Sequence, residues 1–280
     1  MKPAPACILG ALALAAALGG GRAGAQGAAS AAAPASAASP VAASQAPGLA
    51  PPPALPAKDE RALAVLRRTS DALARMRSFA FSVRSLQPVA VPGGQWASLV
   101  GRYRVSVKRP DRLYVDQGGD LFPQRIYCDG KRVTFWSPDR KVYAQEAAPP
   151  TLDALLARFP GSGEQSLPFA DVLLARPWSA WEKEMLGAVY VGESASPAGA
   201  LDHVAVTSEG VEWQLWVDRK DRLPRLVLAV HTSVPRSPVV MVEFSDWKAD
   251  PQLPASTFAF EPPKGATRIE FRSPAAEAAR

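Results

Sequence analysis

The sequence predicts an α+β fold, in which a large curved antiparallel sheet carries helices over its concave face. Three observations support this fold class. An amphipathic helical stretch is followed by about ten short segments of alternating hydrophobicity, and two short helical segments interrupt these strands. No internal repeat is evident, and the part of the chain with this pattern is expected to form one domain.

Residues 58–77 have the pattern of an amphipathic helix. The apolar stripe of this segment consists of Leu63, Leu66, Leu73 and Met76. The arginines of the segment lie on the other side, as expected for a helix that packs one face on a core. Asp59 and Glu60 come at its start, where negative charge suits the positive end of the helix dipole.

Strands with one buried and one solvated face follow this helix. In residues 101–108, Tyr103, Val105 and Val107 alternate with polar residues, and residues 79–84 show the same period of two. Such alternation is typical of an antiparallel sheet. The pair Asp129-Gly130 predicts a tight hairpin between two of the strands. We therefore expect a first meander of strands, a second run over residues 188–246, and a last strand near residues 268–271.

Two helical segments are expected between the two runs of strands. Residues 151–159 begin with Thr151, a good capping residue, and residues 169–176 form the second segment. Pro177 is predicted to end the second helix, because proline disrupts a helix interior.

Residues 1–25 have the features of a secretory signal peptide. The apolar run of residues 6–18 is shorter than the about 20 residues of a membrane helix, and residues 23–25 (AGA) suit a cleavage site. Cys7 lies too far upstream to be the lipid-bearing cysteine of a lipoprotein. Residues 26–57, rich in Ala, Pro, Ser and Gly, predict a disordered tether. The folded domain is expected over residues 58–272, with a tail at 273–280.

The net charge of the chain is +6, and loss of Lys2 and Arg22 with the leader lowers it by two. Acidic and basic residues alternate, for example in residues 218–222, which indicates a solvated surface rather than the basic patch of a nucleic-acid-binding protein. The small positive excess still allows weak peripheral attraction to anionic lipid head groups.

The sequence contains no Gly-x-Ser-x-Gly, His-Glu-x-x-His, Cys-x-x-Cys or calcium-loop pattern. His203 and His231 lie on predicted strands and could meet beside Asp202, but strand histidines are more often surface or core residues. Cys128 has no histidine nearby in sequence and is interpreted as a packing residue. We therefore expect no catalytic residue, no metal and no other cofactor.

Residues 211–217 place bulky side chains on both faces of one strand. Trp213 shares a face with Leu215, and Trp216 lies on the opposite face. This pattern means either that both faces are covered or that one of them lines a cavity. Ordinary core packing is the more frequent situation for such residues, and both interpretations remain open.

Several segments in a fixed order carry a family resemblance. They are KRPDRL at 108–113, YCDGK at 127–131, WSP at 136–138, VYA at 142–144, LPFADVL at 167–173, EWQLW at 212–216, LPR at 223–225 and FEPPKGA at 260–266. Together they resemble a domain-of-unknown-function family of predicted periplasmic proteins (domain of unknown function 2092). That family is similar in pattern to the superfamily of the outer-membrane lipoprotein carrier LolA.

The resemblance implies a periplasmic, half-open β-barrel with helices as a lid over an apolar cavity. In that superfamily the cavity accepts an acyl chain of a lipid or lipoprotein, or serves stress sensing. Alternation along the strands selects the candidate cavity residues Phe81, Tyr103, Val105, Trp213 and Leu215. The alternative is an envelope protein–protein interaction module without a lipid ligand. A monomer is expected in either case.

Overall fold

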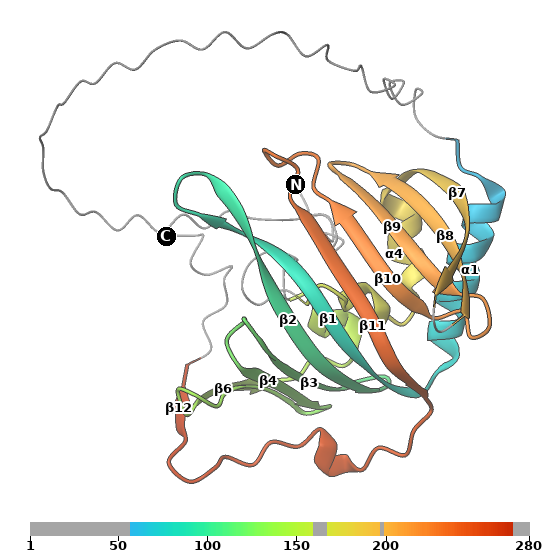
Figure 1. Ribbon diagram of the computed structural model, residues 1–280. Helices are drawn as coiled ribbons and strands as arrows, with labels where there is room; N and C mark the ends of the chain where they lie inside the picture. Colours follow the sequence, from blue (N-terminus) through green and yellow to red (C-terminus); the bar gives the residue numbers. More distant parts are fainter. Residues whose placement is uncertain (1–56, 159–166, 197–198, 271–280) are drawn as a thin grey trace, which may run out of the picture. The chain divides into compact units, whose positions relative to one another are not determined.

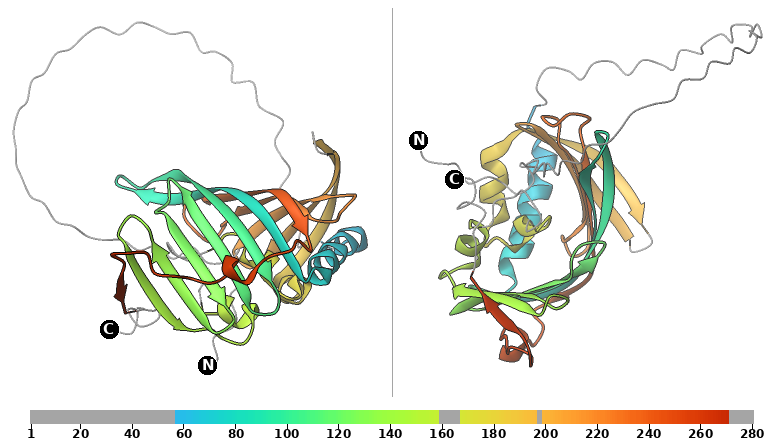
Figure 2. Two further views of the ribbon diagram at one scale, coloured as in Figure 1. Left: turned by 90° about the horizontal axis from the view of Figure 1, so that it is seen from below. Right: turned by 90° about the vertical axis from the view of Figure 1, so that its left-hand side faces the viewer.

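The computed structural model describes residues 57–158, 167–196 and 199–270. The expected signal peptide, the tail and nearly all of the expected tether lie outside these ranges. Within them, the predicted fold class is confirmed, because one large antiparallel sheet curves around a set of helices on its concave side (Figures 1 and 2). No helix among the described residues is long and apolar enough to cross a membrane.

Helix α1 (Glu60–Arg75) confirms the predicted amphipathic helix to within two residues at each end. Asp59 precedes it as the N-cap, and its Oδ1 accepts a hydrogen bond from the backbone N–H of Arg61 at 2.9 Å. The apolar stripe is buried, and Leu66 and Leu73 are fully so. The helix packs against β7, β8 and α4, so its position is fixed by one side of the sheet.

The strands form two meanders and one short addition. The first meander consists of β1 (Ser78–Val91), β2 (Gln95–Lys108), β3 (Arg112–Gly119), β4 (Gln124–Asp129), β5 (Arg132–Ser137) and β6 (Val142–Ala147). The second consists of β7 (Met185–Ser196), β8 (Gly199–Ser208), β9 (Val211–Asp218), β10 (Pro224–Val230) and β11 (Val239–Ala249). The last strand, β12 (Thr267–Ile269), pairs with β6 in the parallel direction, unlike the antiparallel pairs of the rest of the sheet.

The order of the strands explains why helices cover the concave face. Antiparallel pairing of β1 with β11 joins the two meanders, so the order is β12-β6-β5-β4-β3-β2-β1-β11-β10-β9-β8-β7. The chain leaves β6 near one edge and enters β7 at the other edge. The described parts of this connection contain α2 (Leu152–Leu156), α3 (Ala170–Leu173) and α4 (Pro177–Glu184), which lie on the concave side (Figure 2).

These helices correct part of the sequence prediction. Thr151 caps α2 as predicted, since its Oγ1 accepts from the N–H of Ala154 at 3.1 Å. The second predicted helix is shorter than expected, because α3 is a single turn. The prediction that Pro177 ends a helix is wrong. Pro177 instead begins α4, where its missing N–H costs no hydrogen bond and its fixed φ suits the first helical position.

The convex face of the sheet is covered over β4, β5 and β6. There Phe260 packs on Tyr127, Trp136 and Tyr143, with ring centroids 5.4, 5.7 and 5.1 Å apart. Phe260 belongs to the C-terminal segment that contains the short 3-10 helix η2 (Ala255–Thr257) and runs back toward β12 (Figure 1).

Candidate functional site

The concave face begins as rows of apolar side chains on β1 and β2. Phe81 lies opposite Val105, and Val83 lies opposite Tyr103, in the antiparallel register of the two strands. Because side chains on a strand alternate between faces, these residues all lie on the side covered by the helices, and each is at most 4% exposed. The alternation seen in the sequence therefore places an apolar floor beneath α3 and α4.

The structure brings the five predicted cavity residues together on this floor. All five are buried, although β9 is separated from β1 by β10 and β11. Phe81 and Tyr103 both meet Phe169 edge-on, with ring centroids 5.8 and 5.1 Å apart. Trp213 meets Trp181 of α4 at 5.9 Å. We name residues 167–184, which carry these covering side chains, the lid. That the five residues contact a ligand stays a prediction.

A small hollow lies in the seam between the lid and β9–β11, with a volume of about 20 Å³. Its lining is mainly apolar and includes Phe169, Trp181, Trp213, Leu215 and Phe244. Sites for small molecules usually measure about 300–1,000 Å³, so the seam holds no more than a water-sized group in this conformation. The apolar interior is therefore filled by the lid, and an acyl chain would have to displace it.

One polar group in this seam lacks a partner. Trp181 is 5% exposed, and its indole Nε1 is buried without a hydrogen-bond acceptor among the described residues. The neighbouring Trp213 differs, since its Nε1 donates to Oγ of Ser208 at 3.2 Å. Buried donors in native structures are nearly always paired. The Trp181 N–H is thus a free donor in a residue that lines the hollow.

A polar layer borders the apolar floor on β1 and β2. The Tyr103 hydroxyl accepts from Nε2 of Gln87 at 2.7 Å, and the same amide lies 3.0 Å from Oγ of Ser85, which is fully buried. Burial raises the pKa of Tyr103 to about 12, so the phenol stays neutral. The concave face therefore changes from apolar to hydrogen-bonding along the strands.

The hydrogen bonds that hold the lid come from outside the apolar floor. Arg109, in the turn between β2 and β3, donates from Nη1 to the carbonyl of Leu173 at 3.0 Å and from Nη2 to that of Leu174 at 2.8 Å. Ser70 of α1 accepts from the N–H of Trp178 at 3.0 Å. In contrast, the contacts of Phe169 and Trp181 with the floor are between rings. The lid is thus anchored near its middle by Arg109 and Ser70, and it meets the floor through apolar rings.

The two histidines do not form the shared site that the sequence left open. His203 stacks on Trp216, with ring centroids 4.0 Å apart, and its Nε2 lies 2.9 Å from the amide oxygen of Gln214. His231 follows the end of β10, whose Val230 pairs with Glu212 at the other end of β9. In the described ranges no group of three His, Cys, Asp or Glu residues is arranged to hold a metal ion.

The His203 stack also settles the question of Trp216. Its ring stacks on His203 of the neighbouring strand β8, so on that face Trp216 packs against a polar neighbour. Asp202, the third residue considered, accepts from the Tyr190 hydroxyl at 2.9 Å and lies 3.6 Å from Arg219. Cys128 is buried, its Sγ donates to the carbonyl of Asp111 at 3.1 Å, and burial raises its pKa. These contacts agree with a packing role for Cys128.

Sequence reasoning missed three residues of the seam. Phe244 lies two residues after Val242 on the same buried face of β11, so the alternation that identified the other residues could also have identified it. Phe169 was part of a predicted helix, but the pattern gave no indication of what it covers. Trp181 lies in a helix that was not predicted, and no local signal marks it.

Over residues 62–272 the chain matches the family described as predicted periplasmic protein (DUF2092). The match covers well over half of the chain, so the protein belongs to this family of predicted periplasmic proteins. The family resemblance drawn from the sequence is therefore confirmed. No curated protein matches the chain in sequence.

Solved structures with a similar arrangement share little sequence with the chain. An uncharacterised conserved protein from Thermus thermophilus is 13% identical, with a TM-score of 0.45 over 76% of this chain and 100% of that one. The complex of MucA and MucB from Pseudomonas aeruginosa is 17% identical, with a TM-score of 0.36 over 69% of this chain and 59% of that one. A LolA superfamily protein from Nitrosomonas europaea is 14% identical, with a TM-score of 0.33 over 71% of this chain and 97% of that one.

Proposed function

We propose that the protein is a non-catalytic periplasmic binding protein that takes an acyl chain of a lipid or lipoprotein between its lid and the concave face of its sheet. The observation that carries the proposal is the seam itself. An apolar floor is covered by a lid that meets it through Phe169 and Trp181, and the hydrogen bonds of the lid lie elsewhere. An acyl chain that replaces Phe169 and Trp181 on the floor would therefore exchange apolar ring contacts rather than hydrogen bonds of the floor.

The energetics of an acyl chain are adequate for this exchange. Each CH₂ group that leaves water contributes about 0.8 kcal/mol, so a chain of about 14 such groups would contribute roughly 11 kcal/mol. The acyl chain would take the place of lid side chains on the apolar floor. The floor surface that the lid uncovers would thus be covered again by the acyl chain. Binding therefore requires displacement of the lid but no new polar site in the interior.

The free N–H of Trp181 supports a ligand with a hydrogen-bond acceptor near the chain. An ester or carboxyl oxygen would satisfy this buried donor, which otherwise carries a desolvation cost of about 1–3 kcal/mol. A purely hydrocarbon ligand would leave that cost in place. An acyl ester is thus favoured over an alkane of the same length.

The proposal is tested by native mass spectrometry of the protein purified from the periplasm, together with titration of a fluorescent fatty-acyl ester. We expect either co-purified lipid or saturable uptake of the probe at one molecule per chain. The Phe169→Asp variant places a charge against the floor and should abolish uptake, and its folding is checked by circular dichroism. Absence of both lipid and uptake in the wild type would contradict the proposal.

The filled interior favours a second candidate, an envelope protein–protein interaction module without a lipid ligand. A core that is already packed needs no ligand to be stable, and the hollow of about 20 Å³ is small for one. This candidate predicts that affinity capture recovers one protein partner in stoichiometric amount and no lipid. The Phe169→Asp variant should then retain the partner as long as it folds.

A further inference from the structure

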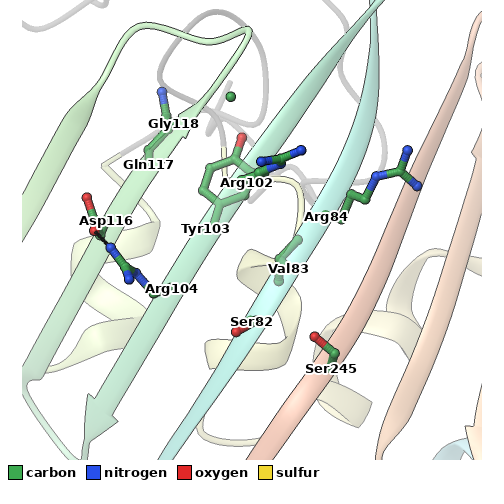
Figure 3. A pocket seen from close by; sticks show the side chains of 11 residues that line it. Ser82, Val83, Arg84, Arg102, Tyr103, Arg104, Asp116, Gln117, Gly118 and Ser245 are labelled. Carbon is green, nitrogen blue, oxygen red and sulfur yellow. Dashed lines mark hydrogen bonds and ion pairs between the residues drawn. The ribbon is translucent and has the colours of Figure 1, made fainter.

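The convex face carries a second and larger hollow, of about 500 Å³, over β11, β1, β2 and β3 (Figure 3). Most of its lining residues are polar or charged, and they include Ser82, Arg84, Arg102, Arg104, Asp116 and Ser245. The lid and the concave seam do not contribute to it. Any ligand of this hollow would therefore differ in chemistry from an acyl chain.

The hollow exists because small residues stand beside long ones. Gly118 of β3 lies directly opposite Arg102 of β2, and a Cβ added at Gly118 would meet no atom within 4 Å. Ser82 of β1 lies opposite Ser245 of β11 on the other flank. Arg102 is thus bordered by open space on the side of Gly118, and the small side chains of Ser82 and Ser245 leave room in the neighbouring row of the sheet.

The register of the strands gathers positive charge in this hollow. Arg84 of β1 lies directly opposite Arg102 of β2, and like charges in this position are unfavourable. Arg84 is 3.3 Å from Glu243, which partly offsets its charge. Arg102 is exposed and has no ion-pair or hydrogen-bond partner among the residues that the structure describes.

The third arginine of the hollow is already paired. Arg104 donates to Asp116 at 2.6 Å, and the same carboxylate lies 3.2 Å from Arg125 of β4. The described residues in and beside the hollow thus include four arginines and two carboxylates, so positive charge is in excess. Figure 3 shows Arg104 turned toward Asp116, and Arg84 and Arg102 on neighbouring strands with Arg84 turned toward β11, where Glu243 lies.

We propose that this convex hollow is a binding site for a phosphate group, held between Arg84 and Arg102. Guanidinium groups present planar pairs of N–H donors that match the oxygens of phosphate. A tetrahedral anion has enough acceptor oxygens for both arginines and for the Ser82 hydroxyl at the same time. Its charge also removes the repulsion between the two arginines. The phosphate can come from a lipid head group at a membrane surface or from free phosphate.

The two sources are separated by two titrations of the folded full-length protein in HEPES buffer. One arm titrates inorganic phosphate by calorimetry, and the other measures sedimentation with phosphatidylglycerol-containing vesicles against phosphatidylcholine vesicles. Each arm compares the wild type with R102Q and with R68Q. Arg68 is an exposed arginine on α1, so R68Q removes the same charge away from the hollow.

In whichever of the two titrations the wild type binds, we expect R102Q to lower the affinity at least tenfold. R68Q should keep an affinity within twofold of the wild type. Loss in the phosphate arm identifies free phosphate as the ligand, and loss in the vesicle arm alone identifies the lipid head group. Equal weakening by R102Q and R68Q would show only general charge attraction and would overturn the site. Binding by the wild type in neither arm would overturn it as well.

Discussion

The two faces of β1 and β2 are built from alternate residues of the same strands, yet they offer opposite chemistry. The concave face presents Phe81 and Val105, both buried beneath the lid. The convex face presents Ser82 and Arg102, which stand in an open and charged hollow. Because side chains alternate between the two faces of a strand, one pair of strands carries two independent candidate sites with unrelated ligands.

The two faces also differ in how they are closed. The chain between β6 and β7 must connect opposite sides of the sheet, and its described helices lie on the concave side. Among the described residues, Phe260 of the C-terminal segment covers the convex face over β4–β6, while Arg84, Arg102 and Arg104 on the convex face of β1 and β2 are exposed. The convex surface of β1–β3 therefore stays accessible, whereas the concave surface requires a movement of the lid.

The largest expected difference between the faces concerns stability. Phe81→Ala removes a ring that contacts Phe169, Phe244 and Trp247 and should lower the free energy of unfolding by about 3–5 kcal/mol. Ser82→Ala, at the next residue, should change it by less than about 0.5 kcal/mol. Urea unfolding followed by tryptophan fluorescence measures both. A cost below about 1 kcal/mol for Phe81→Ala would mean that the concave floor is loosely packed.

The faces of the sheet could be predicted from the sequence because they depend on local alternation. Tyr103, Val105 and Val107 recur at every second residue, so their common burial follows from strand geometry alone. The candidate cavity residues on β1, β2 and β9 were found in this way. Their position under one lid required only that the strands share a sheet.

Helices over the concave face were predicted, but the short extent of α3, the presence of α4 and the convex hollow were not, for two physical reasons. Helix α3 is a single turn and α4 begins at Pro177, so neither has the helical periodicity that identifies longer helices. The hollow depends on register, which places Arg84 opposite Arg102 and Gly118 beside it. Cross-strand register is a property of the assembled sheet and is only weakly encoded in each strand.

The next comparison concerns two tryptophans in the seam. Trp181→Phe removes a donor without a partner, whereas Trp213→Phe removes a donor that is bonded to Ser208. Relief of the unsatisfied donor, about 1–3 kcal/mol, should offset part of the packing lost at Trp181. We therefore expect Trp213→Phe to be the more destabilising change in urea unfolding.

The same variants test the acyl ligand. Trp181→Phe should weaken binding of a fatty-acyl ester about fivefold or more, equivalent to about 1 kcal/mol for one hydrogen bond. Its affinity for the corresponding alkane should not change, which provides the control. Equal affinity of wild type and variant for the ester would exclude the indole N–H as the group that binds the acceptor.

A smaller effect separates the two histidines. Burial lowers the pKa of His231 below its ordinary value of 6.5, so below that pH the unfolded chain binds a proton that the folded chain refuses. Stability should therefore fall as the pH drops below 6.5. His231→Gln should flatten this dependence in melting curves between pH 7 and pH 5 more than His203→Gln does. For His203 the hydrogen bond to Gln214 opposes the lowering of the pKa by burial.

The smallest expected effect lies on the convex face, where Arg102 and Arg84 face each other. Removing one of two like charges that lie directly opposite should stabilise a sheet by a few tenths of a kcal/mol, at about 0.2–1 kcal/mol per such pair. R102Q should therefore raise the melting temperature by about 1 °C at low ionic strength, and R68Q should not. The gain should vanish near 1 M salt, where charges are screened beyond about 3 Å. A gain that persists in salt would mean that Arg102 destabilises the fold through packing rather than through charge, and the repulsion that favours a bound phosphate would be absent.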